Sequence, residues 1–158
     1  MAVTYEPLAT TTLGSNTATV TFSSISGSYT DLILVIAGTV TAGGPGIQFN
    51  SDTGTNYSFT GINGSGSAAS SFRVTNNSNL GIGEMRTYQS NIIVQIQNYS
   101  NATTYKTVLS RANTASDYVQ GIVGLWRSTS AITTIDVKNG SGNFATGCVF
   151  TLYGIKAA

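Results

Sequence analysis

Apolar and polar residues alternate along most of the chain. In the segment from Thr17 to Phe22 every second residue is apolar (Ala18, Val20 and Phe22), and the residues between them are threonines. A period of two places alternate side chains on opposite faces of a β-strand. This pattern, or a short apolar run, recurs in the segments 3–13, 31–37, 46–50, 56–60, 91–99, 103–111, 118–126, 132–137 and 144–155. No segment sustains an apolar period of 3.6 residues, so we expect very little helix.

The order of these segments predicts a fold class. The nearly continuous apolar run 31–37 (DLILVIA) is typical of a central strand covered on both faces. Asn139-Gly140 predicts a hairpin before the last strand, and Gly121 and Gly124 indicate a bulge or a close backbone approach. The segments 62–71 and 76–83 are rich in Gly, Ser and Asn and are interpreted as flexible surface loops. About eight to ten short strands separated by turns predict one all-β domain over residues 1–158, an antiparallel, jelly-roll-like β-sandwich.

Composition then excludes several classes of function. Charged residues make up 8% of the chain, against about 25% in an average soluble protein. The formal net charge is +1, too little for the basic surface that nucleic-acid binding requires. Histidine is absent and Cys148 is the only cysteine, which excludes His-based acid/base catalysis, Cys/His zinc sites and a disulfide scaffold. We expect Cys148, in an alternating segment, to be a small buried hydrophobic residue.

The chain shows neither a membrane span nor a leader. No apolar run reaches the length of a transmembrane helix, and residues 1–6 have no basic or apolar leader pattern. We therefore expect no membrane partner and assembly in a cytoplasm, where Cys148 stays reduced.

The sharpest candidate for a binding site is the segment 50–56 (NSDTGTN). Asp52, with oxygens of Asn50, Thr53 and Asn56, could hold a hard cation such as Ca²⁺. Because Ca²⁺ takes about six to eight oxygens and usually more than one carboxylate, the pattern favours an Asx turn instead. In that turn Asp52 accepts backbone N–H bonds and Gly54 supplies a positive φ.

Other candidates for chemistry are weaker. Gly64-Ser65-Gly66 and Gly81-Ile82-Gly83 lack the Lys-Ser/Thr and the helix of a phosphate-binding loop, so we interpret both as flexible loop tips. Trp126 with Arg127 could form a stacking platform for a sugar or base, but the pattern favours Trp126 as a core or contact residue with Arg127 projecting outward.

Catalytic groups are also poorly supported. A Ser–Lys pair would need Lys106, Lys138 or Lys156, and nothing positions one of them beside a serine. A depolymerase would need paired carboxylates, and no sequence signal brings two together. The six acidic residues are Glu6, Asp31, Asp52, Glu84, Asp117 and Asp136. We therefore predict no catalytic, cofactor-binding or metal-binding residues, no cofactor, and a protein that is not an enzyme.

Several segments, taken in order, carry a resemblance to known proteins. They are 20–25 (VTFSSI), 29–32 (YTDL), 49–58 (FNSDTGTNYS), 98–101 (NYSN), 124–128 (GLWRS), Ala131-Ile132 and 150–156 (FTLYGIK). From about Tyr5 to Lys156 the chain resembles small virion structural proteins of tailed bacteriophages, frequent in marine phages. The resemblance implies a place on the virion, as a capsid decoration or cement protein or as a tail-associated β-sandwich protein. It brings no catalytic residues with it.

These considerations lead to two hypotheses of different kinds. The first is a non-enzymatic structural protein on the capsid or tail surface of the virion, most simply a capsid decoration protein. Its expected partners are the major capsid protein or other virion proteins, and further copies of itself, with a trimer favoured. The alternative is a receptor- or glycan-binding head of a tail fibre or head fibre, which would be present in far fewer copies per particle.

Overall fold

The computed structural model describes residues 4–156 of the protein as β-strands joined by loops, with no helix in that range. Residues 1–3, on which part of the leader prediction rests, and residues 157–158 lie outside the described residues. The strands are β1 (Tyr5–Thr12), β2 (Thr19–Phe22), β3 (Asp31–Gly38), β4 (Pro45–Phe49), β5 (Tyr57–Gly64), β6 (Ala69–Asn77), β7 (Leu80–Gly81), β8 (Ser90–Ile96), β9 (Lys106–Thr114), β10 (Val119–Trp126), β11 (Ile135–Asn139) and β12 (Val149–Ile155).

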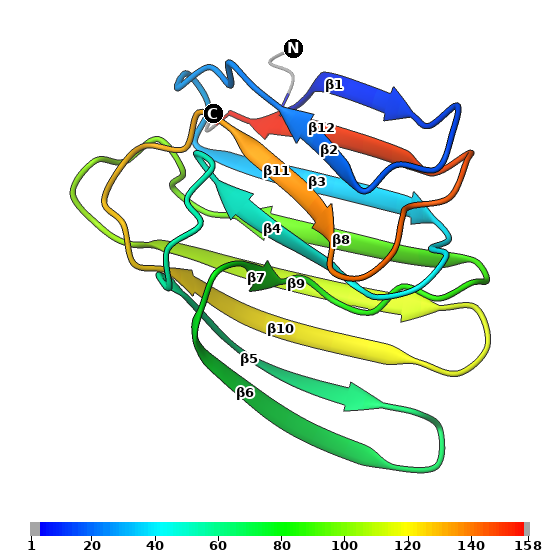
Figure 1. Ribbon diagram of the computed structural model, residues 1–158. Coiled ribbons are helices and arrows are strands. Elements are labelled where there is room, and N and C mark those ends of the chain that lie inside the picture. Colours follow the sequence, from blue (N-terminus) through cyan, green and yellow to red (C-terminus); the bar gives the residue numbers. More distant parts are fainter. Residues whose placement is uncertain (1–3, 157–158) are drawn as a thin grey trace.

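The strands form two antiparallel sheets that pack face to face (Figure 1). The larger sheet has the order β1-β12-β3-β8-β9-β10-β5-β6, and the smaller has the order β2-β11-β4-β7. Early strands pair with late ones: β1 and β3 with β12, β2 and β4 with β11, and β5 with β10. The chain thus passes back and forth between the layers, as in a jelly roll. The predicted all-β antiparallel sandwich is confirmed.

The core lies between the two sheets. Leu32, Leu34 and Ile36 of β3 are fully buried against the smaller sheet, from which Ile47 and Val137 contribute. The central position of β3, between β12 and β8, is confirmed. Cover on its outer face is only partial, because Ile33 is buried there but Val35 and Ala37 remain partly exposed. In β2, Val20 and Phe22 point into the core as predicted, whereas Ala18 precedes the strand and is exposed.

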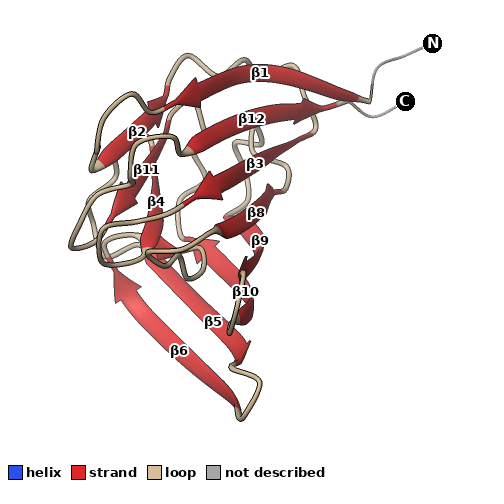
Figure 2. Cartoon of the chain, turned by 90° about the vertical axis from the view of Figure 1, so that its right-hand side faces the viewer, coloured by secondary structure: helices blue, strands red, loops and turns tan. Residues whose placement is uncertain are grey.

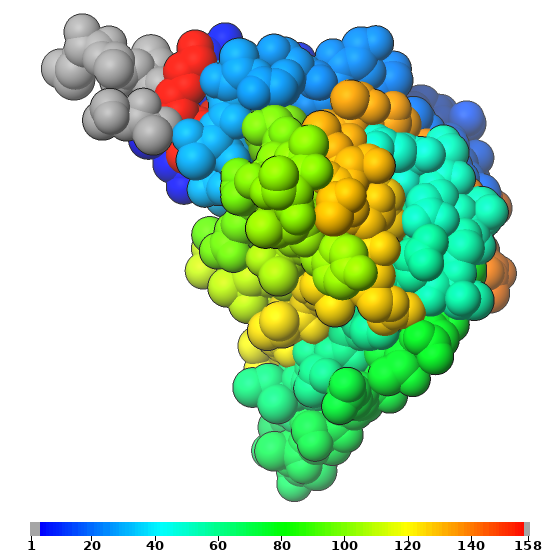
Figure 3. All heavy atoms as spheres, turned by 90° about the vertical axis from the view of Figure 1, so that its left-hand side faces the viewer, coloured from blue at the N-terminus to red at the C-terminus, as the bar shows by residue number. Residues whose placement is uncertain are grey.

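The last two strands of the larger sheet extend beyond the smaller sheet. Figure 2 shows β5 and β6 projecting beyond β2, β11 and β4 of the smaller sheet as a two-stranded overhang, and Figure 3 shows the tip of this overhang in green. The cover ends at β7, where Leu80 packs on Gly124 and Gly81 packs on Phe59. A Cβ on Gly124 would lie 2.4 Å from Leu80 Cδ1, so this glycine permits a close approach of the two layers. The predicted close approach is confirmed there, and the pairing of β10 with β5 and β9 continues without a bulge.

Three local predictions are wrong. Only residues 65–68 of the segment 62–71 form a loop, because β5 continues to Gly64 and β6 starts at Ala69. The segment 76–83 contains the end of β6, β7 and the fully buried Leu80 and Ile82. The strand count therefore exceeds the expected eight to ten.

The predicted hairpin at Asn139-Gly140 does not form either. β11 and β12, on its two sides, belong to different sheets. Asn139 Oδ1 accepts hydrogen bonds from the backbone N–H groups of Ser141 and Gly142, at 3.3 and 3.1 Å. These two bonds do form a turn, but the turn leads the chain from the smaller sheet to the larger one instead of joining two paired strands.

Candidate functional site

The Asp52 segment is a bonded turn that fixes the start of β5. Asn50 and Ser51 both have positive φ, and the N–H of Asp52 donates to the carbonyl of Phe49 at 2.9 Å. Asp52 Oδ1 then accepts a hydrogen bond from the N–H of Gly54 at 2.8 Å. The predicted Asx turn is confirmed. Gly54 is not among the positive-φ glycines, because the left-handed conformations fall on Asn50 and Ser51 instead.

The other carboxylate oxygen of Asp52 is bonded to side chains. Oδ2 accepts hydrogen bonds from Asn56 Nδ2 at 2.9 Å and from Trp126 Nε1 at 2.7 Å. Burial raises the pKa of the Asp52 carboxyl, but the bonds from Trp126, Asn56 and Gly54 together outweigh burial and lower that pKa below its ordinary value. The carboxylate is thus occupied by donors. Within residues 4–156 no three His, Cys, Asp or Glu side chains gather where they could hold a metal ion.

Trp126 lies in the core. It is 2% exposed, its ring stacks on Tyr57 with centroids 6.3 Å apart, and it contacts the ring of Phe49 at 5.4 Å. This confirms the core position of Trp126 and leaves no open stacking face for a sugar or base. Arg127 does not project freely, because its guanidinium donates to Ser58 Oγ, to the carbonyl of Thr55 and to Asn76 Oδ1.

Tyr57 completes this cluster. Its hydroxyl accepts a hydrogen bond from the N–H of Phe49 at 2.9 Å and donates to the carbonyl of Asp52 at 3.2 Å. Burial, reinforced by the charges of Asp52 and Asp136, raises the pKa of Tyr57 to about 12. Asp136 is buried and accepts hydrogen bonds from Thr21 Oγ1 and Ser51 Oγ. The charges of two carboxylates therefore act on the Tyr57 hydroxyl, which the sequence pattern did not indicate.

The three lysines are bonded to groups other than serine. Lys106 Nζ, in a fully buried residue, donates to the carbonyls of Thr104 and Thr129 at 2.8 and 3.1 Å. Lys138 Nζ donates to Gln48 Oε1 at 2.6 Å. Lys156 Nζ lies 2.9 Å from Glu6 Oε2. These contacts tie strands and loops together and assemble no Ser–Lys pair.

The glycine-rich segments also have structural positions. Gly66 has a φ of 83° and turns the chain between β5 and β6, where the N–H of Ser65 donates to the carbonyl of Ala68. Gly64-Ser65-Gly66 is thus a loop tip, as predicted. Gly83 packs on Ala112, where a Cβ would approach the Ala112 Cβ to 2.4 Å. Gly81-Ile82-Gly83 is therefore a packed segment, and its assignment as a flexible tip is wrong.

The most distinctive surface is the outer face of the larger sheet. Four apolar side chains of β5, β9 and β10 project from this face into solvent: Ile62 (68% exposed), Val119 (60%), Val123 (60%) and Leu109 (46%). We call these four residues the outer apolar patch. Strand register brings them together, since Val123 pairs with Leu109 across β10 and β9, and Gly121 pairs with Ile62 across β10 and β5. The patch is larger than scattered exposed residues would give.

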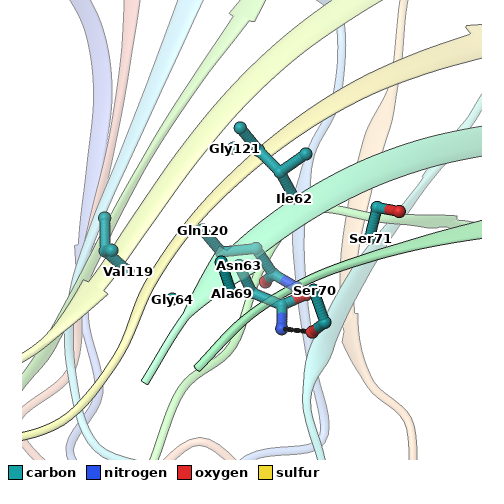
Figure 4. A pocket seen from close by; sticks show the side chains of 9 residues that line it. All are labelled: Ile62, Asn63, Gly64, Ala69, Ser70, Ser71, Val119, Gln120 and Gly121. Atoms are coloured by element: carbon teal, nitrogen blue, oxygen red, sulfur yellow. Dashed lines mark hydrogen bonds between the residues drawn. The ribbon is translucent and has the colours of Figure 1, made fainter. Parts of the chain in front are cut away.

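Small residues make this patch hollow. Val119 stands opposite Gly64 and Ile62 stands opposite Gly121, so two of the four side chains have a glycine as a cross-strand neighbour. A cavity of about 550 Å³ results, lined by Ile62, Asn63, Gly64, Ala69, Ser70, Ser71, Val119, Gln120 and Gly121. Figure 4 shows Ile62 and Val119 standing apart on β5 and β10 at this hollow. A smaller hollow of about 170 Å³, beside Leu109 and Arg111, also contacts Gly121.

The charged side chains of the strands that carry the patch are all of one sign, and the nearest carboxylate, Asp117, lies in the β9–β10 turn beside Val119. The sequences of strands β8, β9, β10, β5 and β6 contain no Asp or Glu. On the outer face Arg111 pairs with Gly121, and Arg73 pairs with Thr60 at the edge. The patch therefore combines exposed aliphatic side chains with two cations, a composition suited to contact with another protein. The sequence did hint at it, because Val119 and Val123 alternate with the core residue Ile122 and make both faces of β10 apolar.

Comparisons with known proteins identify no family for this chain. No family model and no curated protein matches it. Among solved structures, it is similar to a marine alginate lyase from Aplysia kurodai, with 12% identity, 85% of this chain and 72% of that chain covered, and a TM-score of 0.38. It is also similar to the alginate lyase Aly36B in complex with alginate tetrasaccharide, with 10% identity, 94% and 80% covered, and a TM-score of 0.35. Both similarities are slight.

None of residues 4–156 lies in a helix long and apolar enough to cross a bilayer.

Proposed function

We propose that this protein is a non-enzymatic structural protein of a tailed-phage virion, a capsid decoration protein that binds the particle surface through the outer apolar patch. The observation that carries the proposal is the patch itself. Four aliphatic side chains are between 46 and 68% exposed on one sheet face, beside Arg111 and without a carboxylate in the surrounding strands. Burying such side chains against a partner is favourable by roughly 25 cal/mol per Å² of apolar area. The resemblance to virion proteins suggests the partner, which would be the major capsid protein or another virion protein.

The acidic and basic side chains that could act in catalysis are engaged in structural hydrogen bonds, which supports the same proposal. Asp52, Asp136 and Lys106 are each engaged by hydrogen bonds that join strands or turns of the sandwich. A decoration protein needs an ordered body and one face that can bind a partner, and these hydrogen bonds together with the outer apolar patch support that role.

The direct test is co-sedimentation of the purified protein with purified particles from which decoration proteins have been stripped. We expect saturable binding in a high copy number that matches the capsid lattice. Val123→Glu, which places a carboxylate in the patch, should weaken binding at least about tenfold. Thr19→Glu changes an exposed residue of β2 in the other sheet, and it should leave binding unchanged. Equal binding by the two variants, or absence of the protein from mature virions, would overturn the proposal.

A second candidate function is the glycan-binding head of a fibre, and one observation favours it. A separate hollow of about 480 Å³ is lined by Glu84, Arg86, Tyr88 and Asp117, among others. It offers a partly exposed aromatic ring, hydrogen-bond acceptors, and the Arg86 Nε group, which is buried without a partner. Low copy number on the virion, together with glycan binding that Tyr88→Ala abolishes, would favour this function over decoration.

A further inference from the structure

The two sheets have four edge strands, and one of them, β6, has a long regular stretch without proline. An edge strand exposes unpaired N–H and C=O groups, which proteins usually shield by short length, proline, bulges or charge. In the smaller sheet, β2 has four residues and β7 has two. In the larger sheet, β1 contains Pro7 and a register shift between Pro7 and Ala9. β6 has nine residues and no proline, its one charged residue is Arg73, and its register against β5 shifts only near its end, between Val74 and Asn77.

The register of β6 shows which of its backbone groups are free. The N–H of Ser65 donates to the carbonyl of Ala68, so this pair at the hairpin end is hydrogen-bonded. Hydrogen-bonded and non-hydrogen-bonded pairs alternate along an antiparallel ladder. The peptide groups of Ser70, Phe72 and Val74 are therefore directed toward β5, and those of Ala69, Ser71, Arg73 and Thr75 are directed away from it. The regular edge ends at Asn76, whose φ of 54° is left-handed.

We propose that β6 pairs with β6 of a second copy of this chain, antiparallel and around a two-fold axis at Phe72. The outward-directed residues run from Ala69 to Thr75, just past the last regular pair at Val74, and Phe72 is their midpoint. In this register residue 69 lies opposite residue 75 of the other copy, and residue 71 opposite residue 73. Each outward N–H and C=O group then meets its complement.

The charges and side chains of β6 select this register. Centring the pair on Arg73 would place two guanidinium groups directly opposite each other, which is unfavourable. Centring it on Phe72 places Arg73 opposite the small, neutral Ser71. The remaining residues of the regular edge are Ala, Ser, Phe, Val and Thr, which allow close approach of the two backbones.

The position of Phe72 is a second reason to expect that the partner of β6 is another copy of this chain. It lies on the inner side of the overhang, in edge contact with Phe59 at 6.2 Å, and is only partly buried. The smaller sheet ends at β7 and leaves this side of β6 uncovered (Figure 2). In the two-fold pair, Phe72 lies opposite Phe72 at the axis, a cross-strand aromatic contact that covers both rings.

The pairing would also place two copies of the outer apolar patch on one assembly. A two-fold axis between antiparallel edge strands is perpendicular to the sheet, so both outer apolar patches face the same side of the dimer. This proposal stands on the β6 edge and does not require a virion partner.

Sedimentation of the full chain over about a hundredfold range of concentration tests the pairing. We expect a monomer–dimer equilibrium. Ser71→Pro removes an outward N–H and should raise the dimer Kd at least about tenfold, whereas Ser71→Thr, which keeps that N–H, should not. Circular dichroism confirms that both variants are folded. At low salt, Ser71→Glu places a carboxylate opposite Arg73 and should lower the Kd, and Ser71→Lys should raise it.

The register is tested by cross-linking. Phe72→Cys should form a covalent dimer under mild oxidation, while Ser67→Cys, in the hairpin loop away from the axis, should not. The native Cys148 is 1% exposed and does not compete. A monomer at all concentrations, a trimer, or a dimer that Ser71→Pro leaves intact and Phe72→Cys does not cross-link would overturn the proposal.

Discussion

Trp126 and Asp52, which are 74 positions apart in the sequence, are joined by a hydrogen bond of 2.7 Å from the indole Nε1 to the carboxylate Oδ2. The bond connects the end of β10 to the turn that precedes β5. The buried ring fills the core while its N–H anchors the turn, so one residue fixes both packing and chain direction.

Asp52→Asn should weaken the protein most near neutral pH. The folded-state pKa of Asp52 is lowered, so its contribution is present above the unfolded pKa and is lost as pH falls through the folded value. We expect a loss of about 1–2 kcal/mol at pH 7, because a charge-assisted acceptor becomes neutral. Urea unfolding between pH 7 and acidic pH measures it. The difference between wild type and variant should shrink on acidification, and a difference independent of pH would contradict this assignment.

Tyr57→Phe should reduce sensitivity to alkali. Because the pKa of Tyr57 is raised to about 12, folding favours the neutral phenol, and this contribution is present below the unfolded pKa and lost as pH rises through the folded one. The variant should lose about 1–3 kcal/mol near neutral pH, since the Phe49 N–H is left without its acceptor. Above pH 10, its stability should fall less steeply than that of the wild type. If the stabilities of the wild type and the variant fell equally steeply above pH 10, the assignment of Tyr57 as a buried hydroxyl with a raised pKa would be contradicted.

Gly124→Ala should destabilise the sandwich by about 1–3 kcal/mol, because the new methyl group would meet Leu80 Cδ1 at 2.4 Å. Gly64→Ala is the matched control, since its Cβ would lie 3.5 Å from Val119 Cγ1, an ordinary contact. Thermal unfolding should separate the two variants clearly. Adding Leu80→Ala to Gly124→Ala should cost less than the sum of the single changes. Full additivity would show that the two residues do not touch.

Lys106→Met should be tolerated despite its complete burial. Burial lowers the pKa of Lys106, and its hydrogen-bond partners are the neutral carbonyls of Thr104 and Thr129. A side chain of similar volume should change stability by less than about 1.5 kcal/mol. Because the pKa of Lys106 is lower in the folded state than the unfolded value near 10.4, the wild type should gain stability as the pH rises from the folded pKa toward that value. The variant has no ionisable group at this position and should lack this gain. Unfolding curves from pH 7 to 10 provide the measurement.

Local patterns predicted the elements whose faces differ in burial. The alternation in 17–22 and the apolar run in 31–37 identify β2 and β3 because core packing selects those side chains. The strands β5 and β6 were partly missed because the overhang has little cover, so burial imposes no strict alternation on residues 62–71. The Asx turn at Asp52 is a local interaction and was predicted. Its bond to Trp126 was not, since that contact depends on how distant strands come together.

The pairing of β1 with β12 brings both ends of the described chain to the sheet edge opposite β6, where the N–H of Lys156 donates to the carbonyl of Thr4. Figure 1 shows the two ends beside each other. Cargo fused to either end, such as a peptide antigen or a fluorescent domain, would leave from the edge remote from the overhang. The scaffold is thus suited to display, since the outer apolar patch and the two ends of the described chain lie on different parts of the larger sheet.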